Sequence, residues 1–478
     1  MRSKQLIKGM LIISFILAGC GNGSSHAIKD PEFENVSVHD PSVIKTKDRF
    51  YVIGSHMAFA KSEDLIKWEQ LSKNVTTTNL FDDIQKEFED EFDYAQTDTF
   101  WAGDIQKLKD GKYYMYYCLC KGDSPLSALG VAVADDVEGP YKKKETFLYS
   151  GTSPQFDKEY DATVDPNVVD PHVFYDDEGK LWMVYGSYSG GIYLLEMDEN
   201  TGLPKDRHSY GKRLTGGNHC RIEAPYILYN HKTGYYYLFT SFGGLDSFGG
   251  YNIRVARSKS VEGPYEDSEG QPMVDAMGKK GSFFDDKSIE NYGVKLIGNF
   301  LYEKDDGLAN AGYVSPGHNS AYYDEKTDKY FLLFHTRFPN SGELHELRVH
   351  QMFFNEEGWP AVSPIRYADE KIENYHSKQV STRYKMISFS KEINDYTEEP
   401  TIIELKNSGK IVGIQNGSWH LAKNNEQNDS ILTINDIEYK GKFLFIWDEN
   451  QEKQVMTFTG ISKNGVPLYL VEDKEKKP

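Results

Sequence analysis

The sequence has little cysteine. Only four of its 478 residues are cysteine, and three of them, Cys118, Cys120 and Cys220, lie beyond the N-terminal segment. An odd number of so few cysteines is not expected to form a disulfide framework, and their spacing does not match a zinc site. Cys118 and Cys120 would point to the same face of one strand, so neither is well placed to bridge the other. We therefore expect buried free thiols.

Basic residues are too few to balance the acidic ones. The chain carries 54 Lys and Arg against 73 Asp and Glu, a net charge of -19. Nucleic-acid-binding proteins need a basic footprint, so we expect no nucleic-acid partner. The acidic surface otherwise serves mainly solubility, and we expect a monomer.

Long runs with the 3.6-residue period of a helix are scarce. The chain is instead rich in Tyr (33) and Phe (26), with Gly at apparent turns. This composition predicts an all-β protein, and its length allows one large domain and a smaller one. One insert, around residues 81–88, is compatible with a short helix.

The first apolar run, from residue 10 to 17, is too short to span a bilayer comfortably. Three basic residues precede it, which is the layout of a secretory signal. The Leu-Ala-Gly-Cys sequence ending at Cys20 resembles a bacterial lipobox, which implies a lipid anchor on Cys20; a plain signal peptide cut nearby is the alternative. We predict a signal peptide at 1–19, a tether at 20–32, and an exported protein, anchored at the cell surface or secreted.

A polar residue stands four positions before an apolar one at five places. These residues are Asp40, Asp104, Asp170, Glu223 and His318. A polar turn and a strand-like apolar run, usually rich in Tyr, follow each of them. A repeat of about four strands is the blade of a β-propeller, so five copies predict a five-bladed propeller over residues 33–372.

The repeat fades toward the end of the chain. Residues 373–478 contain strand-like runs separated by Asn-rich turns. They predict a small C-terminal β-barrel or sandwich domain, to which we assign no chemistry.

The five repeat residues would converge at one end of the central channel of a propeller. Carboxylates that lie so close cannot all ionise comfortably, so their pKa values separate into those of an acid and a base. Glycoside hydrolysis needs this pair, because a leaving oxygen must be protonated while water is activated. Capping of strands, or binding of a structural ion, is the alternative.

Several motifs around these residues are specific. They are His39-Asp40-Pro41-Ser42, Val169-Asp170-Pro171-His172, Arg221-Ile222-Glu223-Ala224-Pro225-Tyr226, Ser315-Pro316-Gly317-His318 and His335-Thr336-Arg337-Phe338. Together they resemble the five-bladed propellers of glycoside hydrolase family 43, and within it the endo-α-1,5-L-arabinanases. The resemblance covers roughly residues 33–370. The tail resembles the extra C-terminal domain of the larger arabinanases.

The resemblance implies an inverting enzyme that cleaves internal α-1,5 linkages of arabinan, a pectic polysaccharide of the plant cell wall. It implies Asp40 as the general base, Glu223 as the general acid, and Asp170 as the carboxylate that orients Glu223 and raises its pKa. The base and the acid of an inverting enzyme lie about 6.5–9.5 Å apart. Asp165 also precedes a proline, but it lacks the four-residue offset. Asp104 departs from the family pattern, and we expect it to be a structural anchor.

The resemblance also implies that His318 lies beside a channel-bound calcium. Calcium prefers oxygen ligands, so such a site would be loosely specified, and a buried structural histidine is the alternative. Trp101 is a candidate platform for sugar stacking. Asn167, Ser187 and Arg337 are family-level candidates for hydrogen bonds to sugar hydroxyls.

Two other functions stay open at this point. One is an exo-acting α-L-arabinofuranosidase or β-xylosidase on the same fold, which a blocked channel end would favour. The other is a surface polysaccharide-binding protein without catalysis. A binding protein has no need of all three acids, Asp40, Asp170 and Glu223, so their presence argues against it.

Overall fold

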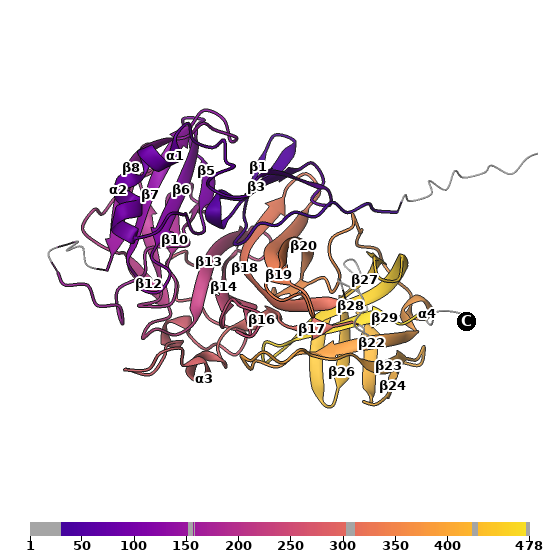
Figure 1. The fold of residues 1–478 in the computed structure, drawn as a ribbon. Helices are drawn as coiled ribbons and strands as arrows, with labels where there is room; N and C mark the ends of the chain where they lie inside the picture. The colour runs from indigo at the N-terminus through magenta and orange to yellow at the C-terminus, as the bar shows by residue number, and fades with distance from the viewer. Residues whose placement is uncertain (1–29, 152–155, 157, 303–310, 423–428, 475–478) are drawn as a thin grey trace, which may run out of the picture. The chain divides into compact units, whose positions relative to one another are not determined.

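The computed structural model describes residues 30–151, 156, 158–302, 311–422 and 429–474. Strands dominate this part of the chain, and its helices are short (Figure 1). None of the described helices is long and apolar enough to cross a membrane. The predicted signal peptide and Cys20 lie outside the described residues.

Strands β1 to β21 form five consecutive antiparallel sheets, the five blades that the repeat predicts. Blade one contains β1 (Ser42–Thr46), β2 (Arg49–Ile53), β3 (Phe59–Ser62) and β4 (Trp68–Ser72). Blade two contains β5 (Asp104–Lys107), β6 (Tyr113–Cys120), β7 (Ser127–Ala134) and β8 (Lys142–Ser150). Blade three contains β9 (His172–Tyr175), β10 (Leu181–Tyr185), β11 (Ile192–Met197) and β12 (Lys212–Thr215).

The last two blades carry the longest strands of the propeller. Blade four contains β13 (Ile222–Asn230), β14 (Tyr235–Phe242), β15 (Asn252–Ser258) and β16 (Val294–Ile297). Blade five contains β17 (Phe300–Leu301), β18 (Gly312–Asp324), β19 (Lys329–Arg337), β20 (His345–Phe354) and β21 (Pro360–Val362). Blade five therefore has five strands where the repeat predicts four. The additional strand is the short β17, which pairs with the edge of β18 that faces away from β19.

One strand of each blade lines the central channel. β1, β5, β9, β13 and β18 contact one another in this order, and β18 returns to contact β1. This closed ring is what brings residues far apart in the sequence to the same end of the channel.

The packing between blades follows from the two-residue period of the strands. In β6, Met115 and Tyr117 face the core shared with blade one, whereas Tyr116 and Cys118 face the core shared with blade three. A strand buried on both faces needs an apolar residue at every position, which explains its run of Tyr, Met, Leu and Cys. All three described cysteines are free and buried, as predicted.

The insert between blades one and two contains two short helices, α1 (Ile84–Glu87) and α2 (Glu89–Ala95). The Asp83 carboxylate caps α1 by accepting a hydrogen bond from the backbone N–H of Lys86, 3.2 Å away. The short helix expected around residues 81–88 is therefore confirmed.

The C-terminal strands close into an eight-stranded barrel, which decides between the barrel and the sandwich. They are β22 (Arg383–Ser388), β23 (Thr401–Leu405), β24 (Lys410–Gly413), β25 (Gly417–Leu421), β26 (Asp429–Ile434), β27 (Ile437–Asp448), β28 (Lys453–Ser462) and β29 (Pro467–Glu472). Pairing of β22 with β29 closes the barrel (Figure 1). The predicted boundary at residues 372 and 373 falls between β21 and β22, and its position stays a prediction.

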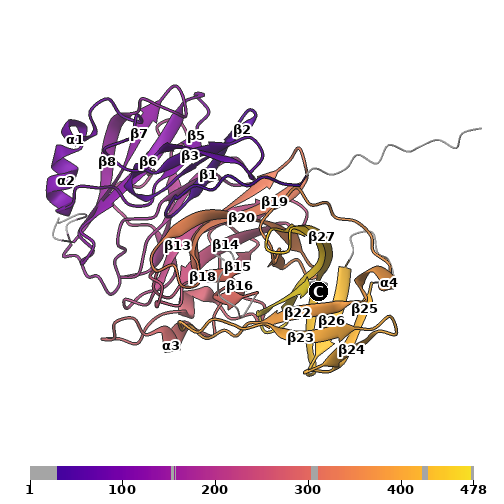
Figure 2. The same cartoon turned by 45° about the vertical axis from the view of Figure 1, so that its right-hand side comes forward.

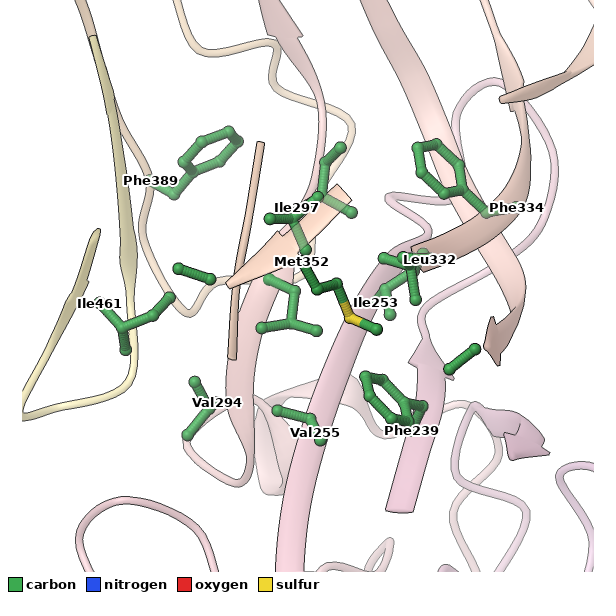
Figure 3. Close-up of a cluster of buried hydrophobic side chains, with 14 of the residues drawn as sticks. Phe239, Ile253, Val255, Val294, Ile297, Leu332, Phe334, Met352, Phe389 and Ile461 are labelled. Carbon is green, nitrogen blue, oxygen red and sulfur yellow. The ribbon is translucent and has the colours of Figure 1, made fainter. Parts of the chain in front are cut away.

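Barrel side chains share a core with blades four and five. Figure 3 shows Phe389 and Ile461 of the barrel region in one cluster with Val294 and Ile297 of β16. The hydroxyl of Tyr469 adds a hydrogen bond of 2.7 Å to the carbonyl oxygen of Leu296. The barrel therefore completes the hydrophobic core of the propeller beside blades four and five.

Asp104 cross-links three blades. Its Oδ1 accepts a 2.6 Å hydrogen bond from the hydroxyl of Ser42 in blade one. Its Oδ2 accepts a 2.7 Å hydrogen bond from the backbone N–H of Val173 in blade three. The side chain is buried, and both of its oxygens have partners, so these contacts agree with the structural anchor expected from the sequence.

Asp104→Ala should lower the free energy of unfolding by about 2–4 kcal/mol, because it leaves the buried N–H of Val173 without a partner. Urea denaturation measures this loss. Asp135→Ala is the matched control, since Asp135 is an exposed aspartate of the same blade, and it should change stability by less than about 0.5 kcal/mol. Equal stability of the two variants would contradict the anchor role.

Candidate active site

Asp40, Asp170, Glu223 and His318 meet at one end of the channel. His318 Nδ1 lies 3.0 Å from Asp40 Oδ1. The backbone N–H of Ala224, next to Glu223, donates a 3.3 Å hydrogen bond to Asp170 Oδ2. His318 interacts electrostatically with Asp170 and Glu223 as well as with Asp40, so these four residues lie together. The convergence predicted for all five repeat residues is wrong for Asp104.

The fifth repeat residue, Asp104, has a different setting. It lines a cavity of about 880 Å³ together with His172 and Tyr226, and neither Asp40 nor Glu223 lines that cavity. The rings of His172 and Tyr226 stack with centroids 3.4 Å apart. Asp104 therefore belongs to a different layer of the channel from the carboxylates.

Backbone conformation also separates Asp104 from its equivalents. Asp40, Asp170 and His318 have φ values of 57°, 56° and 45°, and Ala224, which follows Glu223, has 55°. Asp104 is instead an ordinary strand residue that pairs with Tyr116 in β6. Left-handed conformations of residues other than glycine cost of order 1–3 kcal/mol and cluster at functional sites.

The Asp40 carboxylate is held by three side chains. His39 Nδ1 lies 2.8 Å from Oδ2, the hydroxyl of Ser55 donates to the same oxygen, and His318 contacts Oδ1. Burial alone would raise the pKa of Asp40, but the imidazoles of His318 and His39 hold it well below its ordinary value. Asp40 is therefore an anion over a wide pH range, which a general base requires.

His335 supports Asp40 as a neutral ring. Burial holds the pKa of His335 well below its ordinary value. Its Nδ1 accepts a 3.1 Å hydrogen bond from the backbone N–H of Asp40, so the proton of the neutral ring lies on Nε2. The 3.5 Å approach of Nδ1 to Asp40 Oδ1 is thus not an ion pair. The ring also stacks on His39, with centroids 4.0 Å apart.

The Glu223 carboxyl group is buried and fixed by two hydroxyl groups. Tyr251 donates a 2.7 Å hydrogen bond to Oε1, and Ser187 donates one of 2.7 Å to Oε2. Burial raises the pKa of Glu223, while the His318 charge and the two hydrogen bonds oppose that rise, and the net shift is upward. A raised pKa keeps a proton on this group, as a general acid requires.

Asp170 and His318 complete the charge pattern. Burial raises the pKa of Asp170, and the nearby charges of Glu223 and Asp40 raise it further, against the opposing charge of His318. Burial alone would lower the pKa of His318, but Asp40 and Asp170 raise it to about 9. The site therefore combines an imidazole with a raised pKa, one carboxylate with a lowered pKa, and two carboxyl groups with raised pKa values.

The four residues predicted to contact substrate have different settings. Ser187 binds the carboxyl group of Glu223. The side-chain oxygen of Asn167 accepts hydrogen bonds from the hydroxyls of Ser127 and Ser150. Trp101 is half-buried against the core of blades two and three.

The fourth of them, Arg337, is buried. Its Nε donates a 2.5 Å hydrogen bond to Glu343, and its Nη1 lacks a partner among the described residues. The contacts of these four residues with sugar stay predictions. Sequence reasoning missed Ser55 and Tyr251, which lie outside the motifs and reach the site only through the fold.

The donors around His318 do not form a calcium cage. Among the described residues, one group of three close His, Cys or carboxylate donors occurs, His39, Asp40 and His335, and His318 is not in it. Calcium takes six to eight oxygen ligands, whereas His318 offers one imidazole. An ion beside His318 would therefore take most of its ligands from water.

Comparisons with known proteins identify the class of this fold and site. Residues 33–288 match the family model described as glycosyl hydrolases family 43, and residues 364–470 match a C-terminal lipocalin-like domain. The chain belongs to glycosyl hydrolase family 43.

Particular relatives cover nearly the whole chain. It is 52% identical over 97% of its length, and 99% of the relative's, to extracellular endo-alpha-(1->5)-L-arabinanase 2 of Bacillus subtilis. It is 46% identical to the extracellular endo-alpha-(1->5)-L-arabinanase of Thermotoga petrophila, over 94% of this chain and 96% of that one. The crystal structure of endo-1,5-alpha-L-arabinanase from Thermotoga petrophila RKU-1 superposes with a TM-score of 0.88 at 45% identity, covering 93% of this chain and all of that one.

Proposed function

We propose that this protein hydrolyses internal α-1,5-L-arabinofuranosidic linkages of arabinan with inversion of configuration. The observation that carries the proposal is the pairing of an ionised Asp40 with a Glu223 whose pKa is raised, at one end of the channel. The two relatives that resemble the chain over almost its full length are named endo-alpha-(1->5)-L-arabinanases, which supports the choice of arabinan and of internal cleavage.

In this mechanism Asp40 takes a proton from a water molecule as that water attacks the anomeric carbon. Glu223 gives its proton to the departing sugar oxygen, so the leaving group departs neutral. Asp170 stabilises the backbone beside Glu223 through its hydrogen bond with the N–H of Ala224. Inversion requires a separation of about 6.5–9.5 Å between the base and acid carboxyl groups, to hold the water.

Product sizes test the proposal. Incubation with linear debranched arabinan should release mixed short oligosaccharides early, because an endo enzyme cuts at internal positions. Chromatography of samples taken at low conversion measures this. Release of arabinose alone would indicate an exo enzyme. Tight binding to arabinan without release of sugar would indicate a polysaccharide-binding protein instead.

Glu223→Gln should lower kcat on arabinan by at least about a thousandfold while binding persists, because the amide cannot supply the proton. Tyr251→Phe tests the same role while leaving the carboxyl group of Glu223 in place. It removes a hydrogen bond that stabilises the Glu223 carboxylate, so the pKa of Glu223 rises further. Activity is lost as pH increases through that pKa, so the alkaline limb of the pH profile should move about one unit higher. An unmoved limb, or near wild-type turnover of Glu223→Gln, would contradict the acid assignment.

We further propose a calcium ion beside His318, with water supplying most of its ligands and with the imidazole neutral while the ion is bound. The ion would add positive charge near the carboxyl groups and so help to keep Asp40 ionised. Elemental analysis of the purified protein should find about one calcium per chain, which His318→Ala releases. A metal-free wild-type protein with full activity would remove this proposal in favour of a buried structural histidine.

We propose that the protein is exported. The basic N-terminal residues and short apolar run support this, and so does the word extracellular in the names of both relatives. Lipidation of Cys20 and the monomeric state stay predictions.

A further inference from the structure

Two adjacent phenylalanines are exposed on the insert between β15 and β16. Phe283 is 70% exposed and Phe284 is 55% exposed. Asp285 separates them from α3 (Asp286–Ile289), which is labelled in Figures 1 and 2. Single exposed apolar side chains are common on protein surfaces, whereas large contiguous apolar patches mark interaction sites.

These rings extend a group of aromatic side chains from neighbouring loops. Phe283 stacks on His219, with ring centroids 4.4 Å apart and an interplanar angle of 19°. Phe284 meets Tyr188 edge to face at 5.7 Å. We call Tyr188, His219, Phe283 and Phe284 the aromatic platform.

The aromatic platform is attached to residues beside the proposed general acid. Tyr188 follows Ser187, whose hydroxyl binds the carboxyl group of Glu223. Arg221, two residues before Glu223, donates from Nε to Asp286 Oδ1 over 3.0 Å, and its guanidinium lies 5.9 Å from the ring of Phe284. The insert is thus fixed on the rim of the site by an ion pair.

The backbone of the platform is strained in three places. Tyr188, His219 and Phe284 have φ values of 47°, 57° and 56°, a conformation that bulky residues rarely adopt. Hydrogen bonds hold it: the N–H of Phe284 donates to the carbonyl oxygen of His219, 3.2 Å away, and the N–H of His219 donates to that of Ser189, 2.9 Å away. Strain of this kind persists only where the surrounding structure holds it, and it clusters at active sites and at loops that clamp ligands.

We propose that the aromatic platform is a subsite that binds furanose units of the arabinan chain beyond the bond being cleaved. This inference rests on the proposed function and adds the position of the arabinan chain on the enzyme surface. An uncharged sugar chain presents C–H faces that pack on aromatic rings and hydroxyl groups that stay hydrated. A surface hollow of about 380 Å³, lined by Phe284, Asp286 and Asn394, lies next to the platform and gives room for a sugar unit.

Phe283→Ala/Phe284→Ala should raise KM for linear arabinan about three- to tenfold, because two stacking contacts are lost, while kcat stays within about twofold. Hydrolysis of arabinotriose should change less than hydrolysis of the polymer. Ile414→Ala is the control, since Ile414 is 73% exposed in the barrel region, and it should leave both constants unchanged. A KM within twofold of wild type in the correctly folded double variant would overturn the subsite.

A binding measurement separates this inference from the proposed function. Affinity electrophoresis in arabinan gels compares Glu223→Gln with the triple variant that also lacks both phenylalanines. Weaker retardation of the triple variant supports the subsite, even if the wild-type protein proves not to hydrolyse arabinan. Equal retardation of both overturns the subsite and leaves the proposed hydrolysis standing. Absence of retardation for both variants, with no hydrolysis by the wild type, overturns the subsite and the proposed function together.

Discussion

Three carboxyl groups are buried close together at one end of the channel, and charging all three at once is unfavourable. This constraint separates their pKa values. Burial favours the protonated form of each carboxyl group. His318 and His39 outweigh burial only at Asp40, since they contact its oxygens directly. Asp170 and Glu223 keep raised pKa values. A base and an acid thus arise from chemically similar side chains because two histidines contact Asp40 directly, whereas burial dominates at Asp170 and Glu223.

The fold maintains this unequal environment through ring closure and local backbone strain. The five inner strands contact one another in a closed ring, so the residues at their starts cannot move apart without separating blades. Left-handed backbone at Asp40, Asp170 and His318 directs these positions differently from Asp104, which keeps a regular strand conformation and links the blades. One repeated sequence position therefore supplies both the chemistry and its scaffold.

The sequence predicted the blades because each copy carries its own turn and its own apolar strand, which are local signals. It predicted the convergence of Asp40, Asp170, Glu223 and His318 because propeller geometry makes equivalent positions meet. It could not predict Tyr251, which reaches Glu223 from the loop before β15 without any motif. The same holds for the fifth strand of blade five and for the choice of a barrel, since both depend on pairing between distant segments.

The shared core between the barrel and the last two blades has a consequence for modular engineering. Phe389 and Ile461 pack with Val294 and Ile297, and Tyr469 binds the carbonyl oxygen of Leu296. A propeller truncated before β22 would present this apolar surface to water and lose a buried hydrogen bond. The C-terminal barrel is therefore a poor candidate for exchange or deletion as an independent module, in contrast to appended domains joined by a flexible linker.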